Sequence, residues 1–202
     1  RSQMQRGTLL FAGAISGAVS AAVYMLFALA ESSGGYASAL GFGLGSGILS
    51  GMLSLGILPF WENLFDVLTP MKMMELSNPN QPLLRRLLME ASGTYHHSIV
   101  VANLAEQAAD AIGADGLFAR TAAYYHDVGK LKRPVFFKEN QVGSENPHDH
   151  IAPELSAMIL ISHTTDGVAI AKKYRLPQQI QDVIRCHHGD TMTAYFYGKA
   201  CK

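Results

Sequence analysis

The hexapeptide YHDVGK occupies residues 125–130, at the end of a helix predicted over 116–126. Its His126-Asp127 pair places an imidazole beside a carboxylate, and a glycine follows two residues later. An imidazole can bind one metal ion, while the two oxygens of a carboxylate can bridge to a second. The hexapeptide therefore predicts a metal site in which Asp127 is shared between two ions.

Helical phase separates two neighbours among the histidines, all of which lie from position 96 onward. On a helix predicted over 95–112, His97 falls on the apolar face that includes Leu104, whereas His96 falls on a polar face. His126 falls on an alanine-rich face that another helix can approach closely. We therefore expect His97 and His126 to point into the domain and His96 to point toward solvent or the rim of a site.

Further histidines lie on or at the ends of predicted helices, namely His163, His187 and His188. A single histidine is more often a surface residue or a hydrogen-bonded core residue, and that interpretation stays open for each of them. A buried histidine still needs a partner for its polar atoms, and a metal ion is one such partner. The joint pattern favours a shared metal site. His148 and His150, in the loop NPHDHI, are expected at the rim or against a substrate.

Apolar residues recur at helical spacing from Pro82 onward, and no stretch alternates as a strand does. The predicted helices cover 82–91, 95–112, 116–126, 153–162, 164–174 and 177–187. Residues 82–202 are therefore expected to form an all-α domain. Residues 62–81 combine an amphipathic segment with the turn cluster SNPN, and we expect them to connect this domain to the preceding part of the chain.

Two uncharged segments precede the domain: residues 8–30, TLLFAGAISGAVSAAVYMLFALA, and residues 36–60, YASALGFGLGSGILSGMLSLGILPF. Each is long enough to cross the ~30 Å hydrocarbon core of a lipid bilayer as a helix. Residues 1–61 are therefore expected to form a transmembrane helical hairpin with the short turn ESSGG. Glycines four residues apart suit close packing of its two helices: Gly13 and Gly17 in the first segment, and Gly43, Gly47 and Gly51 in the second.

Two alternatives to the hairpin are a secretory signal peptide for the first segment and a buried helix of a soluble protein for the second. The first apolar stretch is longer than the core of a signal peptide, and a second span follows it. The string GFGLGSG at 41–47 lacks the GxGxxG spacing of a dinucleotide-binding loop, and no βαβ pattern surrounds it. The hairpin is the favoured interpretation.

Charge is distributed unevenly along a chain with 16 basic and 16 acidic residues. Residues 1–61 carry only Arg1, Arg6 and Glu31, and basic residues flank the predicted hairpin on both sides. The positive-inside rule then places both ends of the hairpin, and the helical domain, in the cytoplasm of a multi-pass cell-membrane protein. A neutral chain also lacks the basic excess that is typical of DNA- and RNA-binding proteins.

Cysteine usage is sparse, with Cys186 and Cys201 alone. Two cysteines do not make a disulfide framework, and a cytoplasmic domain would keep both of them reduced. We expect Cys186 to be a small core residue.

Eight short strings between residues 93 and 200 carry a resemblance: GTYHHS (93–98), VANLAE (101–106), YHDVGK (125–130), FFKENQ (136–141), NPHD (146–149), ISH (161–163), HHG (187–189) and YFYGKA (195–200). In this order, behind a membrane hairpin, they resemble the HD-domain phosphohydrolases, and within these the membrane-anchored PgpH-type cyclic di-AMP phosphodiesterases. The related HD-GYP branch carries GYP after its paired histidines. Here Gly189 is followed by Asp190-Thr191-Met192, which favours the cyclic di-AMP branch.

The resemblance implies an all-helical fold around two divalent metal ions, for which iron or manganese suits the ligands best. His97, His126 and Asp127 would hold one ion, and Asp127 would bridge to a second held by His163, His187 and His188. The family also supplies a further aspartate from a later helix, for which this sequence has no match. Because the chain begins with arginine and lacks that aspartate, we expect a fragment of a longer membrane protein.

The implied reaction is metal-assisted hydrolysis of the small molecule cyclic di-AMP to pApA at the cytoplasmic face of the membrane. Asp127 and Lys130 are the expected catalytic residues, with Lys130 against a phosphate oxygen. Arg133 and His148 are further candidates for substrate binding, and a solvated surface role stays open for both Lys130 and Arg133. Alternative functions are hydrolysis of another nucleotide and a membrane receptor that binds a nucleotide without cleaving it. A homo-oligomer is also compatible with the sequence.

Overall fold

The computed structural model describes residues 6–30, 35–141, 143 and 146–201. These residues form helices and turns, with no strand among them, so the prediction of an all-α fold is confirmed. The chain divides into two compact units, Arg1–Met71 and Lys72–Lys202. This boundary falls inside the connector that the sequence predicts over 62–81.

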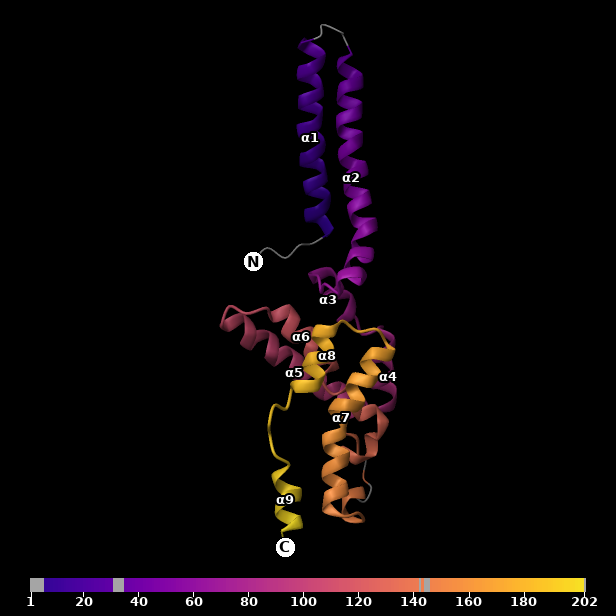
Figure 1. Ribbon diagram of the computed structural model, residues 1–202, viewed down its shortest axis with the longest axis vertical. Helices are drawn as coiled ribbons and strands as arrows, with labels where there is room; N and C mark the ends of the chain where they lie inside the picture. The colour runs from indigo at the N-terminus through magenta and orange to yellow at the C-terminus, as the bar shows by residue number, and fades with distance from the viewer. Residues whose placement is uncertain (1–5, 31–34, 142, 144–145, 202) are drawn as a thin grey trace. The chain divides into compact units, whose positions relative to one another are not determined.

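The first unit contains two long antiparallel helices, α1 (Arg6–Ala30) and α2 (Tyr36–Phe65), which lie side by side (Figure 1). By length and composition, the stretches Phe11–Ala30 and Tyr36–Glu62 are sufficient to cross a membrane. Their large apolar side chains face outward, and that of Phe42 is 74% exposed. The predicted turn ESSGG lies outside the described residues except for its last glycine.

Glycines form the contact between α1 and α2. A Cβ atom added to Gly47 would lie 2.4 Å from the Cα atom of Gly17, and one added to Gly43 would lie 2.2 Å from the Cα atom of Ala21. At these distances the two helices touch backbone against backbone, which a larger side chain would prevent. Gly45, in contrast, faces open space.

Gly47→Val is expected to destabilise this helix pair by about 1–3 kcal/mol, because the new side chain would have to displace the backbone of α1. Unfolding of the chain in mixed micelles by increasing SDS, followed by the fluorescence of its single tryptophan, Trp61, measures the change. Gly45→Val is the matched control because nothing lies within 4 Å of a Cβ atom at that position. Equal effects of the two substitutions would contradict the glycine contact.

The end of α2 differs from the prediction. The helix continues past the predicted span to Phe65 and contains Pro59, and it ends where Asp66 adopts a left-handed conformation with φ of 49°. Its Glu62 carboxylate accepts a hydrogen bond from the Thr69 hydroxyl. The short helix α3 (Pro70–Leu76) follows, so the predicted connector contains two helical pieces.

After α3, the second unit contains three helices, α4 (Pro82–Glu90), α5 (Ser92–Ala111) and α6 (Gly116–Tyr125), of which α5 and α6 pack against each other (Figure 1). Four short 3-10 turns follow: η1 (Val128–Lys132), η2 (Pro134–Phe136), η3 (Lys138–Asn140) and η4 (Pro147–Asp149). The unit ends with α7 (Pro153–Lys173), α8 (Gln178–Cys186) and α9 (Ala194–Ala200). The most deeply buried large side chains include Leu83, Leu84, Leu87, Tyr125, Val128, Ile180 and Ile184.

Helix α7 corrects the prediction of separate helices over 153–162 and 164–174. The polar run around His163 does not interrupt the helix, because its hydroxyl groups bond to the backbone of the preceding turn. The hydroxyls of Ser162, Thr164 and Thr165 donate to the carbonyl oxygens of residues three positions earlier. His163 therefore lies in the middle of a continuous helix, which holds its ring more firmly than a helix end would.

The predictions that His97 on α5 and Cys186 on α8 lie on buried faces are wrong. The buried face of α5 consists of the small residues Thr94, Ser98 and Ala102, while Leu104 is 62% exposed and the His97 side chain is 47% exposed. Small side chains permit the closest contact with neighbouring segments, and this outweighs the apolar character of the other face. Cys186 is exposed rather than buried, because α8 buries the face that contains Ile180 and Ile184.

Candidate metal centre

Asp127 lies at the junction of α6 and η1, inside a continuous buried segment from Thr121 to Gly129. The segment is anchored by the Tyr125 hydroxyl, which donates to the carbonyl oxygen of Leu76 at 2.6 Å. His126 is the C-cap residue of α6, and Asp127 precedes the first residue of η1. The chain turn between the two elements therefore presents both side chains together, as the hexapeptide predicts.

Gly129 allows η1 to pass directly against α7. A Cβ atom at this position would lie 1.8 Å from the His163 carbonyl oxygen and 2.6 Å from the Gly167 nitrogen. Only a residue without a side chain fits there, and Gly167 provides the matching small residue on α7. This contact brings Asp127 within reach of His163.

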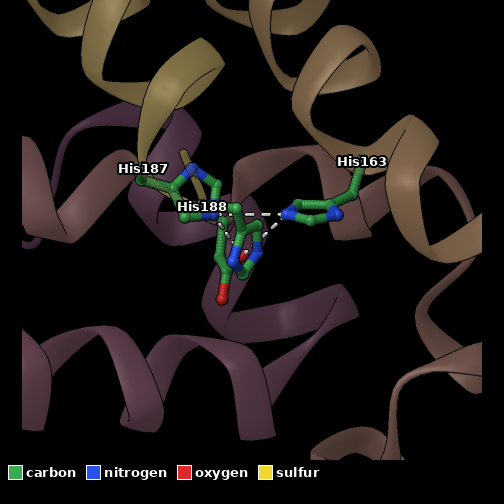
Figure 2. A group of neighbouring side chains, drawn as sticks. His163, His187 and His188 are labelled. Atoms are coloured by element: carbon green, nitrogen blue, oxygen red, sulfur yellow. Dashed lines mark hydrogen bonds and ion pairs between the residues drawn. The ribbon is translucent and has the colours of Figure 1, made fainter. Parts of the chain in front are cut away.

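Four histidine rings surround the Asp127 carboxylate, which is only 3% exposed. Oδ2 lies 3.1 Å from Nε2 of His126 and 3.7 Å from Nε2 of His97. Oδ1 lies 3.4 Å from Nε2 of His163 and 3.6 Å from Nε2 of His187. The two carboxylate oxygens therefore face two different pairs of rings. Figure 2 shows His163 on one helix pointing toward His187 and His188 from another.

Three of these rings are oriented by the backbone of their own helices. The Nδ1 atoms of His126 and His187 donate to the carbonyl oxygens of Ala123 and Ile184, at 2.6 and 2.9 Å. Nδ1 of His163 donates in the same way to the carbonyl oxygen of Leu160. A backbone partner at one ring nitrogen fixes the tautomer and leaves the other nitrogen free for a metal ion.

The candidate ligand atoms form two groups that share Asp127. One group contains Asp127, His163, His187 and His188, the other contains His97, His126 and Asp127, and the atoms within each group lie within 4.8 Å of one another. These groups have the same membership as the two ligand sets that the family resemblance implies.

Charge is closely balanced around the carboxylate. Burial raises the pKa of Asp127, but the neighbouring His126 and His187 rings and the Lys130 ammonium outweigh burial and hold the pKa well below its usual range. Burial lowers the pKa of Lys130, yet Asp127 and Glu139 outweigh it and raise the pKa. Asp127 is therefore an anion and Lys130 a cation at neutral pH.

The residues present fit a divalent metal ion. Asp127 Oδ1 is buried and has no hydrogen-bond partner among the described residues. Nε2 of His163 lies 3.3 Å from Nε2 of His187, and both rings use Nδ1 as a donor. Burial lowers the pKa of His163, so its neutral form presents a lone pair at Nε2. Lone pairs that meet beside a buried carboxylate oxygen need a cation or a shared proton, and imidazole with carboxylate suits a transition metal.

A cavity of about 640 Å³ opens beside the second ligand group. His163, His188 and Lys130 lie in its wall, together with Phe137 and the segment from Gly189 to Thr193 that follows α8. This volume is within the range of small-molecule sites in proteins. Lys130 thus lies beside both the Asp127 carboxylate and the cavity.

Other predicted site residues lie apart from the cavity. Arg133 is oriented toward α7, where its Nη1 donates to the Ser162 hydroxyl at 3.3 Å and lies 3.7 Å from the Asp166 carboxylate. His148 is buried, and its Nε2 donates to the carbonyl oxygen of Phe136 at 2.9 Å. Neither residue is in the cavity wall or in a ligand group. His96 is exposed and also lies outside both groups.

Sequence reasoning missed Glu139. Its carboxylate Oε1 accepts from Lys130 Nζ at 2.6 Å and from the Thr94 hydroxyl at 3.2 Å. The string FFKENQ contains this residue, but no local pattern distinguishes its carboxylate from that of a solvated surface residue. The cavity residues after His188 were missed for a similar reason, since their role depends on how the chain turns after α8.

Two family models match the chain. The model described as "HD domain" matches residues 94–201, and the model described as "7TM receptor with intracellular HD hydrolase" matches residues 1–69. The chain belongs to the HD-domain family. The second match, together with two apolar helices of sufficient length, indicates a membrane protein.

Relatives of the HD-domain chain include two curated proteins named Cyclic-di-AMP phosphodiesterase PgpH. The protein from Bacillus subtilis is 51% identical over 158 residues, which cover 78% of this chain and 22% of the relative. The protein from Listeria monocytogenes is 43% identical over 210 residues, which cover 99% of this chain and 28% of the relative. The chain therefore spans about a quarter of the length of these relatives.

A solved structure resembles the HD domain as well. It is the crystal structure of the L. monocytogenes phosphodiesterase PgpH HD domain in complex with cyclic-di-AMP, with a TM-score of 0.59 and 54% sequence identity. The match covers 61% of this chain and 57% of that chain. The resemblance to PgpH-type proteins predicted from the eight strings is thus confirmed.

Proposed function

We propose that this chain is the membrane hairpin and much of the catalytic domain of a metal-dependent phosphodiesterase that converts cyclic di-AMP to pApA. The observation that carries the proposal is the pair of ligand groups sharing Asp127 beside a cavity. Identity of 43–51% to proteins named as cyclic-di-AMP phosphodiesterases supports the choice of substrate.

The ligand groups are assigned as the family resemblance implies. His97 and His126 would hold one divalent ion, His163, His187 and His188 would hold the other, and Asp127 would contribute to both. Iron or manganese suits this mixture of nitrogen and oxygen ligands. Such ions, when bound, lower the pKa of an attacking water and neutralise charge on the phosphate.

The protein's own residues position the substrate. Lys130 offers an ammonium in the cavity wall to a non-bridging phosphate oxygen. His126 and His187 cap the C-terminal ends of α6 and α8. The negative ends of the two helix dipoles therefore also favour cations at this point.

The proposal also covers how the chain is arranged in the membrane. Residues 1–61 hold the two transmembrane helices, 62–81 connect them to the HD domain at 82–202, and the domain lies on the cytoplasmic side of a multi-pass protein. The basic residues Arg6, Lys72 and Arg85, on either side of the hairpin, support this orientation.

Purified chain in detergent micelles, loaded with Mn²⁺ and incubated with cyclic di-AMP, is expected to form pApA. Chromatography of the nucleotides with mass detection measures the product, and metal analysis of the same sample reports whether the ions are bound. Metal-loaded protein that forms no linear product would contradict the proposal.

A substrate panel separates the alternatives. Cyclic di-GMP and a short RNA at the same concentrations test for a hydrolase of another nucleotide. Binding of cyclic di-AMP without turnover, measured by calorimetry, would indicate a receptor instead. Preferential cleavage of cyclic di-AMP is the expected outcome.

A further inference from the structure

Glu139 belongs to a chain of hydrogen bonds that ends at the metal ligand Asp127. The Asn140 side-chain amide donates to the Thr94 hydroxyl at 2.8 Å, and this hydroxyl donates to Glu139 at 3.2 Å. Glu139 accepts from Lys130 at 2.6 Å, and Lys130 lies 2.8 Å from Asp127 Oδ2. A single ammonium is therefore shared between two carboxylates.

The turn that carries Glu139 is fixed against the beginning of α5. A Cβ atom on Gly93 would lie 1.8 Å from the Glu139 carbonyl oxygen, so the two backbones touch. The Thr94 backbone N–H, in the first turn of α5, donates to the Asn140 side-chain oxygen at 3.0 Å. Thr94 itself is fully buried. The carboxylate of Glu139 is thus held in place from the helix that also carries His97.

The Lys130 ammonium competes with any other cation for the Asp127 carboxylate. Without Glu139, its ammonium would have Asp127 as its one close carboxylate partner among the ion pairs described for this lysine. A lysine fully paired with Asp127 opposes any other cation at that carboxylate. The Phe137 ring, with its centroid 5.0 Å from Nζ, supports the ammonium at the cavity wall but carries no charge.

We propose that Glu139 is a positioning residue, which binds the Lys130 ammonium beside Asp127 and takes up part of its charge, so that the buried carboxylate remains available to a metal ion. The proposal rests on the metal site of the proposed function. Glu139 acts through Lys130 alone and touches neither substrate nor metal ion. It is therefore distinct from the residues of the two ligand groups.

A double-mutant cycle on metal affinity tests this role. Mn²⁺ binding to the whole chain in micelles, followed by the electron paramagnetic resonance of free Mn²⁺, gives a dissociation constant without any substrate. Glu139→Ala is expected to weaken binding about tenfold, the effect typical of losing a residue that supports a metal ligand. Lys130→Ala is expected to tighten binding. The double variant is expected to bind as Lys130→Ala does.

Measuring the effect of Glu139→Ala both in wild-type protein and in the Lys130→Ala variant distinguishes positioning from a structural role. If Glu139→Ala weakens binding by the same factor with and without Lys130, or leaves it unchanged in both, the proposal is overturned. Glu139→Gln keeps the shape of the side chain and replaces Glu139→Ala in the cycle if circular dichroism shows that the alanine variant is unfolded. Glu154→Gln and Lys138→Ala, at exposed positions, are matched controls for loss of one charge.

Failure of the proposed function has a different signature. If the proposed function is wrong, wild-type protein binds Mn²⁺ but leaves cyclic di-AMP intact. The double-mutant cycle, in contrast, depends on metal binding alone. For wild-type protein that does cleave cyclic di-AMP, Glu139→Ala is expected to raise KM and to lower kcat.

Discussion

Asp127→Ala is expected to remove the bound metal and to lower phosphodiesterase activity by about 10³-fold or more, since the electrostatic stabilisation of a transition state is commonly the largest catalytic contribution. The residue is shared by both ligand groups, so its loss affects both at once. The buried negative charge of Asp127 also balances the charge of Lys130 and lies against the His126 and His187 rings. Metal analysis of the purified variant and the rate of cyclic di-AMP hydrolysis measure the two effects.

His96→Ala is the matched control for that substitution. His96 precedes the candidate ligand His97, yet it is exposed and belongs to neither group. The His96→Ala substitution is expected to leave the metal content nearly unchanged. Equal loss of metal in the two variants would refute the assignment of ligands from helix position.

Gly129→Ala is expected to have the largest effect on folding of the substitutions considered. The added methyl group would lie 1.8 Å from the His163 carbonyl oxygen, so η1 and α7 must separate. Overpacking of this kind costs about 1–3 kcal/mol or more, because backbone rather than a flexible side chain has to move. Separation also moves Asp127 away from His163, so we expect weaker metal binding together with a lower melting temperature.

Gly198→Ala provides the comparison, because a Cβ atom in α9 at that position meets nothing within 4 Å. Thermal unfolding by circular dichroism and Mn²⁺ titration apply to both variants. A Gly129→Ala protein with wild-type stability and metal affinity would rule out the close crossing of η1 and α7.

Local pattern was sufficient for most of the helices and for bringing together much of the candidate site. The hexapeptide predicts a helix end with adjacent ligands, and the structure places His126 and Asp127 in that way. The strings ISH and HHG predict ligands on later helices, and His163, His187 and His188 do meet around Asp127. Such residues are recognisable because the chemistry of a metal ligand limits the choice of side chain.

Long-range packing was not predictable in the same way. The apolar stripe with Leu104 suggests a buried face for His97, whereas the small residues Thr94, Ser98 and Ala102 form the contact instead. Glu139 acquires its importance from the close approach of η3 to the start of α5, across 45 residues of sequence. The placement of His148 against Phe136 and Phe196 likewise depends on segments that are distant in the chain.

The backbone tethers of the histidine rings link cation binding at these rings to three helical turns, namely the last turns of α6 and α8 and a turn in the middle of α7. His126, His163 and His187 each donate to a carbonyl oxygen three residues earlier, so each ring is aligned only while that turn is intact. A cation held by these rings must then favour the intact turns by the same free energy with which the turns favour the cation. Fraying at the ends of α6 or α8, even from a substitution far from any ligand, becomes a change in ion occupancy.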